Sequence, residues 1–346
     1  MTDPAPLRYG ILGAANIARQ FCKGVAGSPL AQVAAVASRD AAKATAFATE
    51  LGIPRSHASY EALLADPEIE AVYIPLPNHM HAEWAIRCAE AGKHVLCEKP
   101  LTLTTAEAQA MFAAARTHGV HLAEAYPYMS QPQTLRMREL LREGAIGQLI
   151  SVSAAFGFRL CAADGTPLRD PGNIRLNPAA GGGALLDAGT YAASLAIIAL
   201  NEAPRRVIAT ASWTKTCVDM TVNATVEFTS GAMASITCSF ATAGHRFATL
   251  IGTDGIIETG YANHAPPDCP TLPLRIRRGA LATTAWETET LDTADGFRLE
   301  AESFARLVRH GPTHWNGASE TESLRTVQLL QAIASSIRGA GWITLD

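Results

Sequence analysis

The 346-residue sequence predicts an α/β protein with two parts, a doubly wound parallel sheet followed by a second α/β region rich in antiparallel strands. Two patterns support this fold class. Up to residue 125, short apolar runs alternate with segments of helix length, as in successive βαβ units. Beyond residue 206, alternating β-branched residues are separated by turn signals, which is typical of antiparallel strands. The length also exceeds the usual size of a single core, so two domains are expected.

A change of pattern after Ala125 marks the expected domain boundary. An aromatic passage broken by prolines, residues 126–132, interrupts the alternation there. We therefore expect one domain over residues 1–125 and a second over residues 126–346, with a helix over residues 296–310 in the second.

Composition and charge restrict the kinds of partner. The chain is 48% hydrophobic and 17% charged, with a formal net charge of -4 and no basic stripe, which argues against nucleic acid and anionic membranes. We expect no stretch long enough to span a bilayer. The N-terminus lacks an export signal, so a cytoplasmic protein acting on small molecules is expected. The seven widely spaced cysteines are expected to be buried small hydrophobic side chains, not disulfides or zinc ligands.

The N-terminal segment has the order of strand, tight turn and helix that is found at dinucleotide-binding sites. A strand is expected over residues 9–12 and a helix from Ala18 onward. Small residues stand where a cofactor pyrophosphate would approach the backbone. The expected contacts are Gly13, Ala14, Ala15, Asn16 and Ile17. A small-residue turn that binds nothing is the alternative for this motif taken alone.

The end of the next expected strand, residues 31–37, indicates which nicotinamide cofactor would bind. NAD-binding folds usually offer a carboxylate to the ribose hydroxyls here, whereas this chain has Ser38 and Arg39. A guanidinium and a hydroxyl can bind a ribose phosphate that a carboxylate would repel. The sequence therefore favours NADP over NAD. Alternatively, Ser38 is an ordinary N-cap of the helix that starts near Asp40.

A further turn, Leu76-Pro77-Asn78, follows an apolar run and precedes a helix. We expect Asn78 to cap this helix and the first turn of the helix to face the cofactor. His79 and His81 have no third ligand at zinc-site spacing, so we expect no metal. His81 is expected to be structural or to contact the cofactor.

The apolar run over residues 94–97 stops at Glu98-Lys99-Pro100. The run is typical of a buried parallel strand, and ligands of open α/β sheets bind beyond the carboxyl ends of such strands. Pro100 cannot continue the sheet ladder. Lys99 is therefore expected on a stiff turn at the rim of the ligand site, with Glu98 next to it. The alternative is a solvated surface lysine before a turn.

A glycine-rich segment follows a long loop in the second half of the chain. Loops as long as residues 159–178 are usually functional or disordered. Three glycines then precede an apolar helix expected over residues 192–200, and Asp187 and Tyr191 are four residues apart and hence on one face. The alternative is a buried tyrosine whose hydroxyl is satisfied by a neighbouring carboxylate.

Taken in order, four motifs resemble those of the glucose-fructose oxidoreductase/inositol dehydrogenase (Gfo/Idh/MocA) family. They are Gly13-Ala14-Ala15-Asn16-Ile17-Ala18, Pro77-Asn78-x-x-His81, Glu98-Lys99-Pro100 and Gly181-Gly182-Gly183-Ala184-Leu185-Leu186-Asp187-x-Gly-x-Tyr191. The last motif, with Asp170-Pro171-x-Asn173-Ile174-Arg175, is similar to the branch of NADP-dependent D-xylose dehydrogenases, dimeric dihydrodiol dehydrogenases and aldose oxidoreductases. The resemblance covers nearly the whole chain and is specific for the family, not for the substrate.

The resemblance implies a Rossmann domain that binds NADP, followed by an α/β domain with a large open mixed sheet that is often used for dimer contacts. It implies that Lys99, Asp187 and Tyr191 flank a carbohydrate substrate above the nicotinamide. Tyr126 joins the expected substrate contacts, and Arg175 joins the expected cofactor contacts. A homodimer or homotetramer through the C-terminal sheet is expected.

The resulting hypothesis is an NADP-dependent sugar oxidoreductase. Tyr191 is expected to act as the acid/base, because an adjacent Lys99 ammonium can lower the pKa of a phenol from about 10. Asp187 is expected to orient a sugar hydroxyl or Lys99. Oxidation of an anomeric hydroxyl to a lactone is preferred. A sugar ketoreductase, an aldose oxidoreductase that keeps its NADP bound, and a catalytically silent NADP sensor stay open as alternatives.

One segment departs from the resembled branch. Met129-Ser130-Gln131 stands where members of that branch often carry Arg and His. The usual sugar contacts are therefore not expected to carry over unchanged. The sequence leaves the sugar, the reacting carbon and the direction open.

Overall fold

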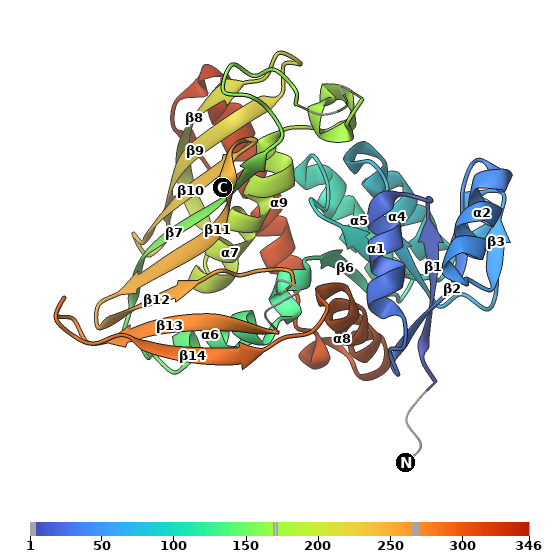
Figure 1. Ribbon diagram of the computed structural model, residues 1–346, viewed down its shortest axis with the longest axis horizontal. Coiled ribbons are helices and arrows are strands. Elements are labelled where there is room, and N and C mark those ends of the chain that lie inside the picture. Colours follow the sequence, from blue (N-terminus) through green and yellow to red (C-terminus); the bar gives the residue numbers. More distant parts are fainter. Residues whose placement is uncertain (1–4, 169, 171, 265–269, 346) are drawn as a thin grey trace. The chain divides into compact units, whose positions relative to one another are not determined.

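The computed structural model describes residues 5–168, 170, 172–264 and 270–345 (Figure 1). The chain divides by packing into two compact units. Unit 1 comprises Met1–Thr102, Ala106–Ser130 and Ala294–Glu320, and unit 2 comprises Leu103–Thr105, Gln131–Thr293 and Thr321–Asp346. Residues 294–320 thus pack with the first part of the chain. The functional division at residue 125 remains a prediction.

Unit 1 is built on a six-stranded sheet with the order β3-β2-β1-β4-β5-β6, in which every strand pair is parallel. This confirms the expected doubly wound sheet. Helices cover parallel sheets of this kind on both faces, which is why the strands are short apolar runs. The strands are β1 (Leu7–Leu12), β2 (Ala31–Ala37), β3 (Arg55–His57), β4 (Ala71–Ile74), β5 (His94–Glu98) and β6 (Leu122–Ala125).

The helices of unit 1 begin and end within a few residues of their sequence signals. The first helix starts at Asn16, two residues before the expected Ala18, and the helix expected over residues 296–310 has those bounds. The helices are α1 (Asn16–Val25), α2 (Ala41–Leu51), α3 (Tyr60–Leu64), α4 (His81–Glu90), α5 (Thr105–Thr117) and α8 (Gly296–His310).

Aromatic contacts explain why α8 belongs to unit 1. The ring of Phe21 on α1 stacks on Tyr73 of β4 at a centroid distance of 3.9 Å. Phe304 of α8 packs against Tyr9 of β1 at 6.2 Å, and the Tyr9 hydroxyl donates to the carbonyl oxygen of Ala301 at 3.0 Å. The helix far along the chain therefore completes the core around the central strand.

Unit 2 is built on a nine-stranded sheet with the order β14-β13-β12-β11-β7-β10-β9-β8-β15. The β7–β10 pair is parallel and the other pairs are antiparallel, which confirms a mixed, mostly antiparallel sheet. The strands are β7 (Leu149–Arg159), β8 (Pro204–Trp213), β9 (Asp219–Phe228), β10 (Met233–Ser239), β11 (Ala241–Gly252), β12 (Gly255–Thr259), β13 (Thr271–Arg278), β14 (Glu287–Asp292) and β15 (Ile343–Thr344).

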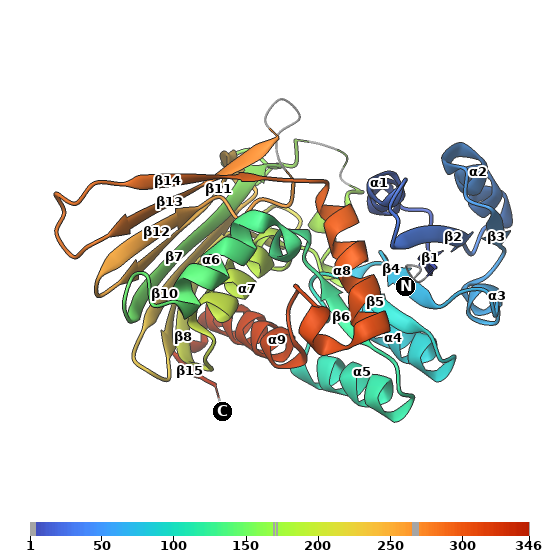
Figure 2. The same ribbon diagram turned by 90° about the horizontal axis from the view of Figure 1, so that it is seen from below.

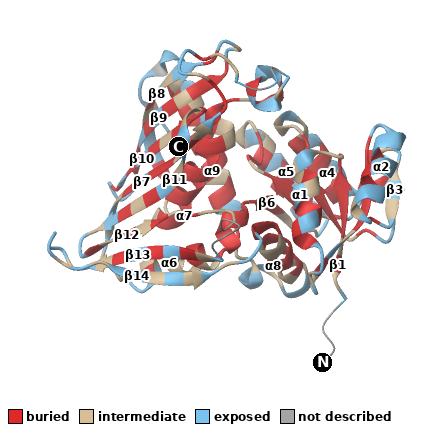
Figure 3. Cartoon of the chain, in the orientation of Figure 1, coloured by how far each residue is buried: buried red, intermediate tan, exposed pale blue. Residues whose placement is uncertain are grey.

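The helices of unit 2 lie along one face of this sheet (Figure 2). They are α6 (Pro132–Arg142), α7 (Thr190–Leu200) and α9 (Glu320–Ser335). Buried and more exposed residues alternate along β9, as expected where only one face of a strand is covered (Figure 3).

Helix α7 lies in the core of unit 2. Pro178–Leu200 is long and apolar enough to cross a membrane, contrary to the expectation that no such stretch exists, yet 83% of its apolar window is buried. The helix begins at Thr190, before the expected residue 192, and a π-helical turn over Leu185–Gly189 precedes it. Such turns are frequent at functional sites.

The described cysteines carry no disulfide. Five of the six are buried, as expected, whereas Cys217 is exposed. Cys269, like Pro171 of the expected loop motif, lies outside the described residues.

Glu300 of α8 places a carboxyl group in the core of unit 1. The residue is 1% exposed, and neither carboxyl oxygen has a hydrogen-bond partner within the part of the chain that the structure describes. Burial, and secondarily the charge of Glu98, raises the pKa of Glu300 well above its usual range. The folded protein therefore holds a proton on Glu300 that the unfolded chain releases at lower pH.

We predict that Glu300→Gln flattens the pH dependence of stability. Because the folded state binds the extra proton, the free energy of unfolding of the natural protein falls as the pH rises above the ordinary glutamate pKa. Each pH unit in that window costs about 1.4 kcal/mol. Unfolding midpoints at pH 5 and pH 7.5 measure the effect, with exposed Glu83→Gln on α4 as the control. The same pH slope in Glu300→Gln and the natural protein would contradict the prediction.

Candidate active site

The carboxyl ends of the parallel strands bring the predicted residues of unit 1 to one edge of its sheet. Gly13 follows β1, Ser38 follows β2, Leu76 lies just beyond β4, Lys99 follows β5 and Tyr126 follows β6. Parallel strands end on the same side, and ligands of open α/β sheets bind at that edge.

The turn after β1 has the geometry of an anion cradle. Gly13 has a φ of +102°, and its N–H donates to the carbonyl oxygen of Ala37 at 2.8 Å, which ties the turn to the end of β2. A side chain at this φ would be strained and would meet Leu76. Ala15 is the N-cap of α1, whose first turn carries no acidic residue and whose first N–H groups have no intrahelical acceptor.

The turn after β2 leaves Arg39 exposed at its tip. Ser38 is buried, and its Oγ accepts from the N–H of Asp40 at 3.2 Å. The N-cap of α2 is Asp40, whose carboxylate accepts from the N–H of Lys43 at 3.1 Å. Ser38 is therefore not the helix cap, and the alternative explanation of this residue is excluded.

Tyr60 lies close to both Arg39 and the glycine turn, which the sequence did not reveal. The Tyr60 hydroxyl lies 3.7 Å from where a Cβ on Gly13 would stand. Its ring packs edge-on against Trp84 at 4.7 Å. Burial raises the pKa of Tyr60, and the charge of the nearby Arg39 guanidinium lowers that pKa in part. The only local signal is Ser59, which caps the short helix α3.

The expected cap of α4 is wrong. Asn78 lies inside a 3-10 turn, Asn78–Met80, whose N-cap is Pro77, and α4 begins at His81. Pro77, with an extended ψ of 142°, precedes the 3-10 turn, so Asn78 is the first residue inside the turn and not its cap.

His81 holds two turns at the ligand edge together. The ring is fully buried, with Nε2 at 2.8 Å from the carbonyl oxygen of Leu76 and Nδ1 at 3.0 Å from that of Pro100. Burial lowers the pKa of His81, and its contacts with carbonyl oxygens offset part of that effect. These contacts support the structural role, and a contact with the cofactor stays a prediction.

Glu98 positions the backbone of Lys99. Its Oε1 accepts from the Tyr73 hydroxyl at 2.5 Å, and its Oε2 accepts from the N–H of Lys99 at 3.2 Å. Glu98 is buried and Lys99 is half-buried, with a cis peptide bond between Lys99 and Pro100. The carboxylate thus anchors the turn from which the lysine side chain starts.

In unit 2, the glycine run brings two predicted residues together. Arg175 Nε donates to Asp187 Oδ2 at 2.7 Å. The N–H of Gly183 donates to the carbonyl oxygen of Arg175 at 2.9 Å. The φ of Gly183, +125°, requires glycine. A Cβ on Gly182 would lie 2.6 Å from the same carbonyl oxygen. The arginine therefore orients the carboxylate, a pairing that the sequence did not predict.

Tyr191 lies in a pocket of aromatic, amide and guanidinium groups. Asn263 Nδ2 donates to its hydroxyl at 3.1 Å. The Arg246 guanidinium stacks over the Tyr191 ring at 4.2 Å, and Nη1 of Arg246 donates to Asn263 Oδ1 at 3.2 Å. Phe156 packs edge-on against the tyrosine at 5.5 Å. Asn263 and Arg246 carry no motif signal, because they come from a loop and a strand far from the glycine run.

Met129-Ser130-Gln131, the segment that departs from the resembled branch, contacts the loop that carries Asn263. Gln131 is fully buried, and its Nε2 donates to the carbonyl oxygen of Asn263 at 2.7 Å. Its Oε1 accepts from the Thr293 hydroxyl at 2.7 Å. Gln131 thus supports the loop that holds the Tyr191 hydroxyl.

The structure brings the predicted residues together in two sets, one in each unit. Tyr126 is buried, with its ring edge-on to Tyr128 at 5.9 Å. The set in unit 1 is Gly13, Ala14, Ala15, Asn16, Ile17, Ser38, Arg39, Leu76, Pro77, Asn78, His81, Glu98, Lys99 and Tyr126. The set in unit 2 is Arg175, Asp187 and Tyr191.

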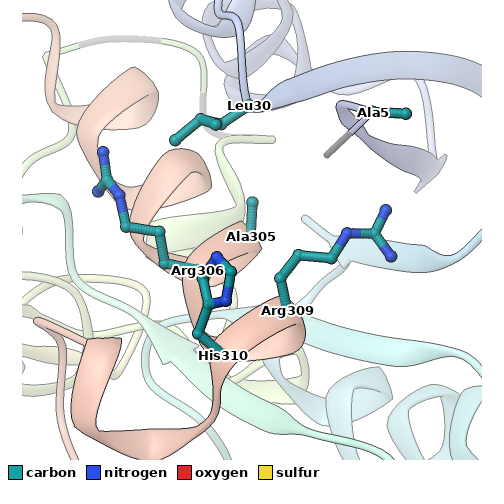
Figure 4. Close-up of a pocket in the computed structure, with 6 residues that line it drawn as sticks. All are labelled: Ala5, Leu30, Ala305, Arg306, Arg309 and His310. Atoms are coloured by element: carbon teal, nitrogen blue, oxygen red, sulfur yellow. The ribbon is translucent and has the colours of Figure 1, made fainter. Parts of the chain in front are cut away.

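A hollow on unit 1 lies away from these residues (Figure 4). It is lined by Ala5, Leu30, Ala305, Arg306, Arg309 and His310. Ala5 and Leu30 precede β1 and β2, so the hollow is at the amino ends of the strands, opposite to the ligand edge. Over residues 5–168, 170, 172–264 and 270–345, no group of three or more His, Cys, Asp or Glu residues could hold a metal ion.

Known proteins with similar sequences and structures extend over nearly the whole chain. A D-xylose 1-dehydrogenase (NADP(+)) of Haloferax volcanii is 38% identical over 98% of this chain and 100% of its own length. A 3-ketoreductase of Actinomadura kijaniata, solved with NADP and TDP-benzene, is 32% identical with a TM-score of 0.83 over 96% of this chain and 98% of that one. An aldose-aldose oxidoreductase of Caulobacter crescentus, solved with glycerol, is 26% identical with a TM-score of 0.85 over 98% and 100%.

Two family domains match in the expected order. Residues 7–126 match the domain described as "Oxidoreductase family, NAD-binding Rossmann fold", and residues 134–258 match the GFO/IDH/MocA C-terminal domain. The matched regions include the glycine turn, Glu98-Lys99-Pro100 and the segment with Asp187 and Tyr191. The chain belongs to the GFO/IDH/MocA oxidoreductase family.

Proposed function

We propose that this enzyme uses NADP to transfer a hydride between the nicotinamide and a sugar hydroxyl or carbonyl. The preferred reaction is oxidation of a pyranose at C1 to a lactone. The observation that carries the proposal is that Lys99, Asp187 and Tyr191 are each positioned by hydrogen bonds. The backbone of Lys99 is anchored at the ligand edge of unit 1, and the Asp187 and Tyr191 side chains are oriented by Arg175 and Asn263 in unit 2. The relative named D-xylose 1-dehydrogenase (NADP(+)) supports the aldose and the cofactor.

The residues of unit 1 fit a dinucleotide phosphate. The left-handed Gly13 turn and the N-terminus of α1 offer backbone N–H groups without a competing carboxylate. Arg39, exposed beside buried Ser38, would bind the 2′-phosphate of NADP, for which a guanidinium has matching geometry. NADP supplies the hydride chemistry when it is bound.

The residues of both units supply the proton chemistry and the orientation. Tyr191 removes the proton from the sugar hydroxyl at its phenolic oxygen, or returns it in the reverse reaction. The Lys99 ammonium stabilises the phenolate and donates to the substrate oxygen. Asp187, held by Arg175, accepts from a second sugar hydroxyl. Tyr126 is proposed as a further contact with the sugar.

A ketoreductase is the second candidate. The 3-ketoreductase of Actinomadura kijaniata is 32% identical over almost the full chain, so the same residues could reduce a carbonyl at another sugar carbon. The aldose-aldose oxidoreductase favours a variant in which NADP stays bound between two half-reactions. A silent NADP sensor fits less well, because such a sensor needs no Asp187 or Tyr191.

We also propose a cytoplasmic homodimer or homotetramer that forms through the open face of the unit 2 sheet. Met233 on β10 and Ile251 on β11 both pair with Ser151 of β7 and therefore share a face. They are 36% and 41% exposed, and Phe247, on the same face, is 51% exposed. Apolar side chains on an open sheet face are typical of a subunit interface.

We predict that Arg39→Ala weakens NADP binding about 10- to 100-fold, because a charged hydrogen-bond partner of the phosphate is lost. NAD binding changes less than about 3-fold, since NAD has no 2′-phosphate. Titration of tryptophan fluorescence with each cofactor measures both constants. Arg116→Ala, at the far end of α5, is the control. Equal weakening of NAD and NADP would contradict the assignment of Arg39.

We predict that Tyr191→Phe lowers kcat at least ~100-fold, because general acid-base catalysis typically contributes that much. NADP binding stays within about 2-fold of the natural protein, since Tyr191 is not one of the expected cofactor contacts. Absorbance of the reduced nicotinamide with a panel of aldoses measures turnover. Tyr9→Phe, in the core of unit 1, is the matched control. Near-normal turnover of Tyr191→Phe would remove Tyr191 from the mechanism.

A further inference from the structure

Arg246 of β11 is part of the Tyr191 pocket but has no part in the mechanism described so far. Its guanidinium carbon lies 4.2 Å from the centroid of the Tyr191 ring, 4.6 Å from that of Tyr261 and 5.0 Å from that of Phe156. Nη1 of the same guanidinium donates to Asn263 Oδ1, and Asn263 Nδ2 donates to the Tyr191 hydroxyl. One cation therefore contacts the Tyr191 ring directly and its oxygen through one amide.

We propose that Arg246 is a positioning residue for Tyr191, which fixes the direction of the phenolic oxygen through Asn263 and stabilises the phenolate by its charge. This inference rests on the proposed function, because it concerns the same tyrosine. Arg246 is then an electrostatic partner of Tyr191 within unit 2, in addition to Lys99 of unit 1.

The amide link favours the charged form of Tyr191. Nη1 of Arg246 donates to Asn263 Oδ1, so the amide nitrogen of Asn263 faces the tyrosine oxygen as a donor. Hydrogen-bond donation to an oxygen that becomes charged stabilises the ionised state, and a cation over the ring face acts in the same direction. Both effects lower the pKa of the phenol.

Two carboxylates of unit 2 near the glycine run, those of Asp187 and Asp219, do not supply this effect. Asp187, one turn earlier, is paired with Arg175. Asp219 of β9 accepts from the N–H of Leu185 at 2.6 Å, and burial raises its pKa. Carboxylates here oppose the phenolate and do not favour it.

Two neutral titratable groups close by, Tyr261 beside Arg246 and Cys238 near Tyr261, do not compete with Tyr191 for the role. Burial raises the pKa of Tyr261, despite the nearby Arg246, and its hydroxyl donates to the carbonyl oxygen of Ala155 at 2.8 Å. Burial also raises the pKa of the Cys238 thiol. Arg246 thus acts on Tyr191 in a setting where burial favours the protonated form of its other phenolic neighbour, Tyr261.

The test is a direct titration of Tyr191 in the full chain. Protein with 13Cζ-labelled tyrosine is titrated by NMR between pH 6 and pH 12, and the Tyr191 signal is assigned by its loss in Tyr191→Phe. We expect Arg246→Met to raise the pKa of Tyr191 by at least about one unit, and Arg246→Lys, which keeps the charge, to raise it by less than half as much. Arg275→Met removes an arginine that stacks on Trp286 elsewhere in the sheet and serves as the matched control.

Turnover with the aldose that the natural enzyme oxidises gives a second readout. The kcat of Arg246→Met should fall at least about tenfold at pH 7 and recover as the pH rises, while NADP binding is unchanged and Arg246→Lys restores part of the loss. A purely structural role would lower kcat by the same factor at every pH.

The two readouts separate this inference from the proposed function. The NMR titration needs no catalysis, so inactivity toward every sugar would count against the function and leave the pKa comparison valid. If Arg246→Met does not fold, Arg246→Gln removes the charge and keeps N–H donors. An unchanged Tyr191 pKa in a folded variant without the charge overturns the inference.

Discussion

The parallel pairing of β1 on both of its edges is the constraint on which the ligand edge of unit 1 depends. Its residues pair with β2 through Leu12↔Ala37 and with β4 through Ile11↔Tyr73, so the strand cannot shift without breaking two ladders. The N–H of Gly13, the residue after β1, donates to Ala37 at the end of β2, and the φ of +102° at this position favours glycine. The turn after β1 is therefore tied to the registry of the sheet.

The same edge is held by polar groups that the sheet buries. Glu98 is satisfied by Tyr73 and by the N–H of Lys99, and His81 joins the Leu76 and Pro100 turns. Buried polar groups must find partners, so a change in one of these side chains would move a turn at the ligand edge. The backbone of Lys99 is thus anchored by a neighbouring carboxylate.

Much of this fold was predictable from local sequence. The bounds of α8 matched because an amphipathic helix between a good cap and a terminal glycine is a local signal. The return of α8 to unit 1 was not predictable, because only its packing on Tyr9 and Phe21 reveals it. The expected Asn78 cap failed because a 3-10 turn was inserted before α4, which propensity alone does not distinguish from a longer helix.

The candidate site shows the same limit more clearly. Lys99, Asp187 and Tyr191 stand in compact motifs, so spacing was enough to select them. Asn263 donates to the Tyr191 hydroxyl, and Arg246 and Gln131 each bond to Asn263. The three residues come from distant segments, and no local pattern marks them. A buried hydrogen-bond network is a tertiary property, and it becomes visible only when the strands of unit 2 are in register.

This division between motif and network bears on substrate choice. Relatives of this chain include a D-xylose 1-dehydrogenase and a 3-ketoreductase, so proteins similar to this chain carry out different reactions. Residues outside the four motifs, among them those that orient the motif side chains, are candidates for that difference. Gln131 belongs to the segment that departs from the resembled branch, and it bonds directly to Asn263. A change at that position therefore acts on the backbone of Asn263, whose side-chain amide donates to the Tyr191 hydroxyl, so the orientation of this phenolic oxygen is a property by which such chains can diverge.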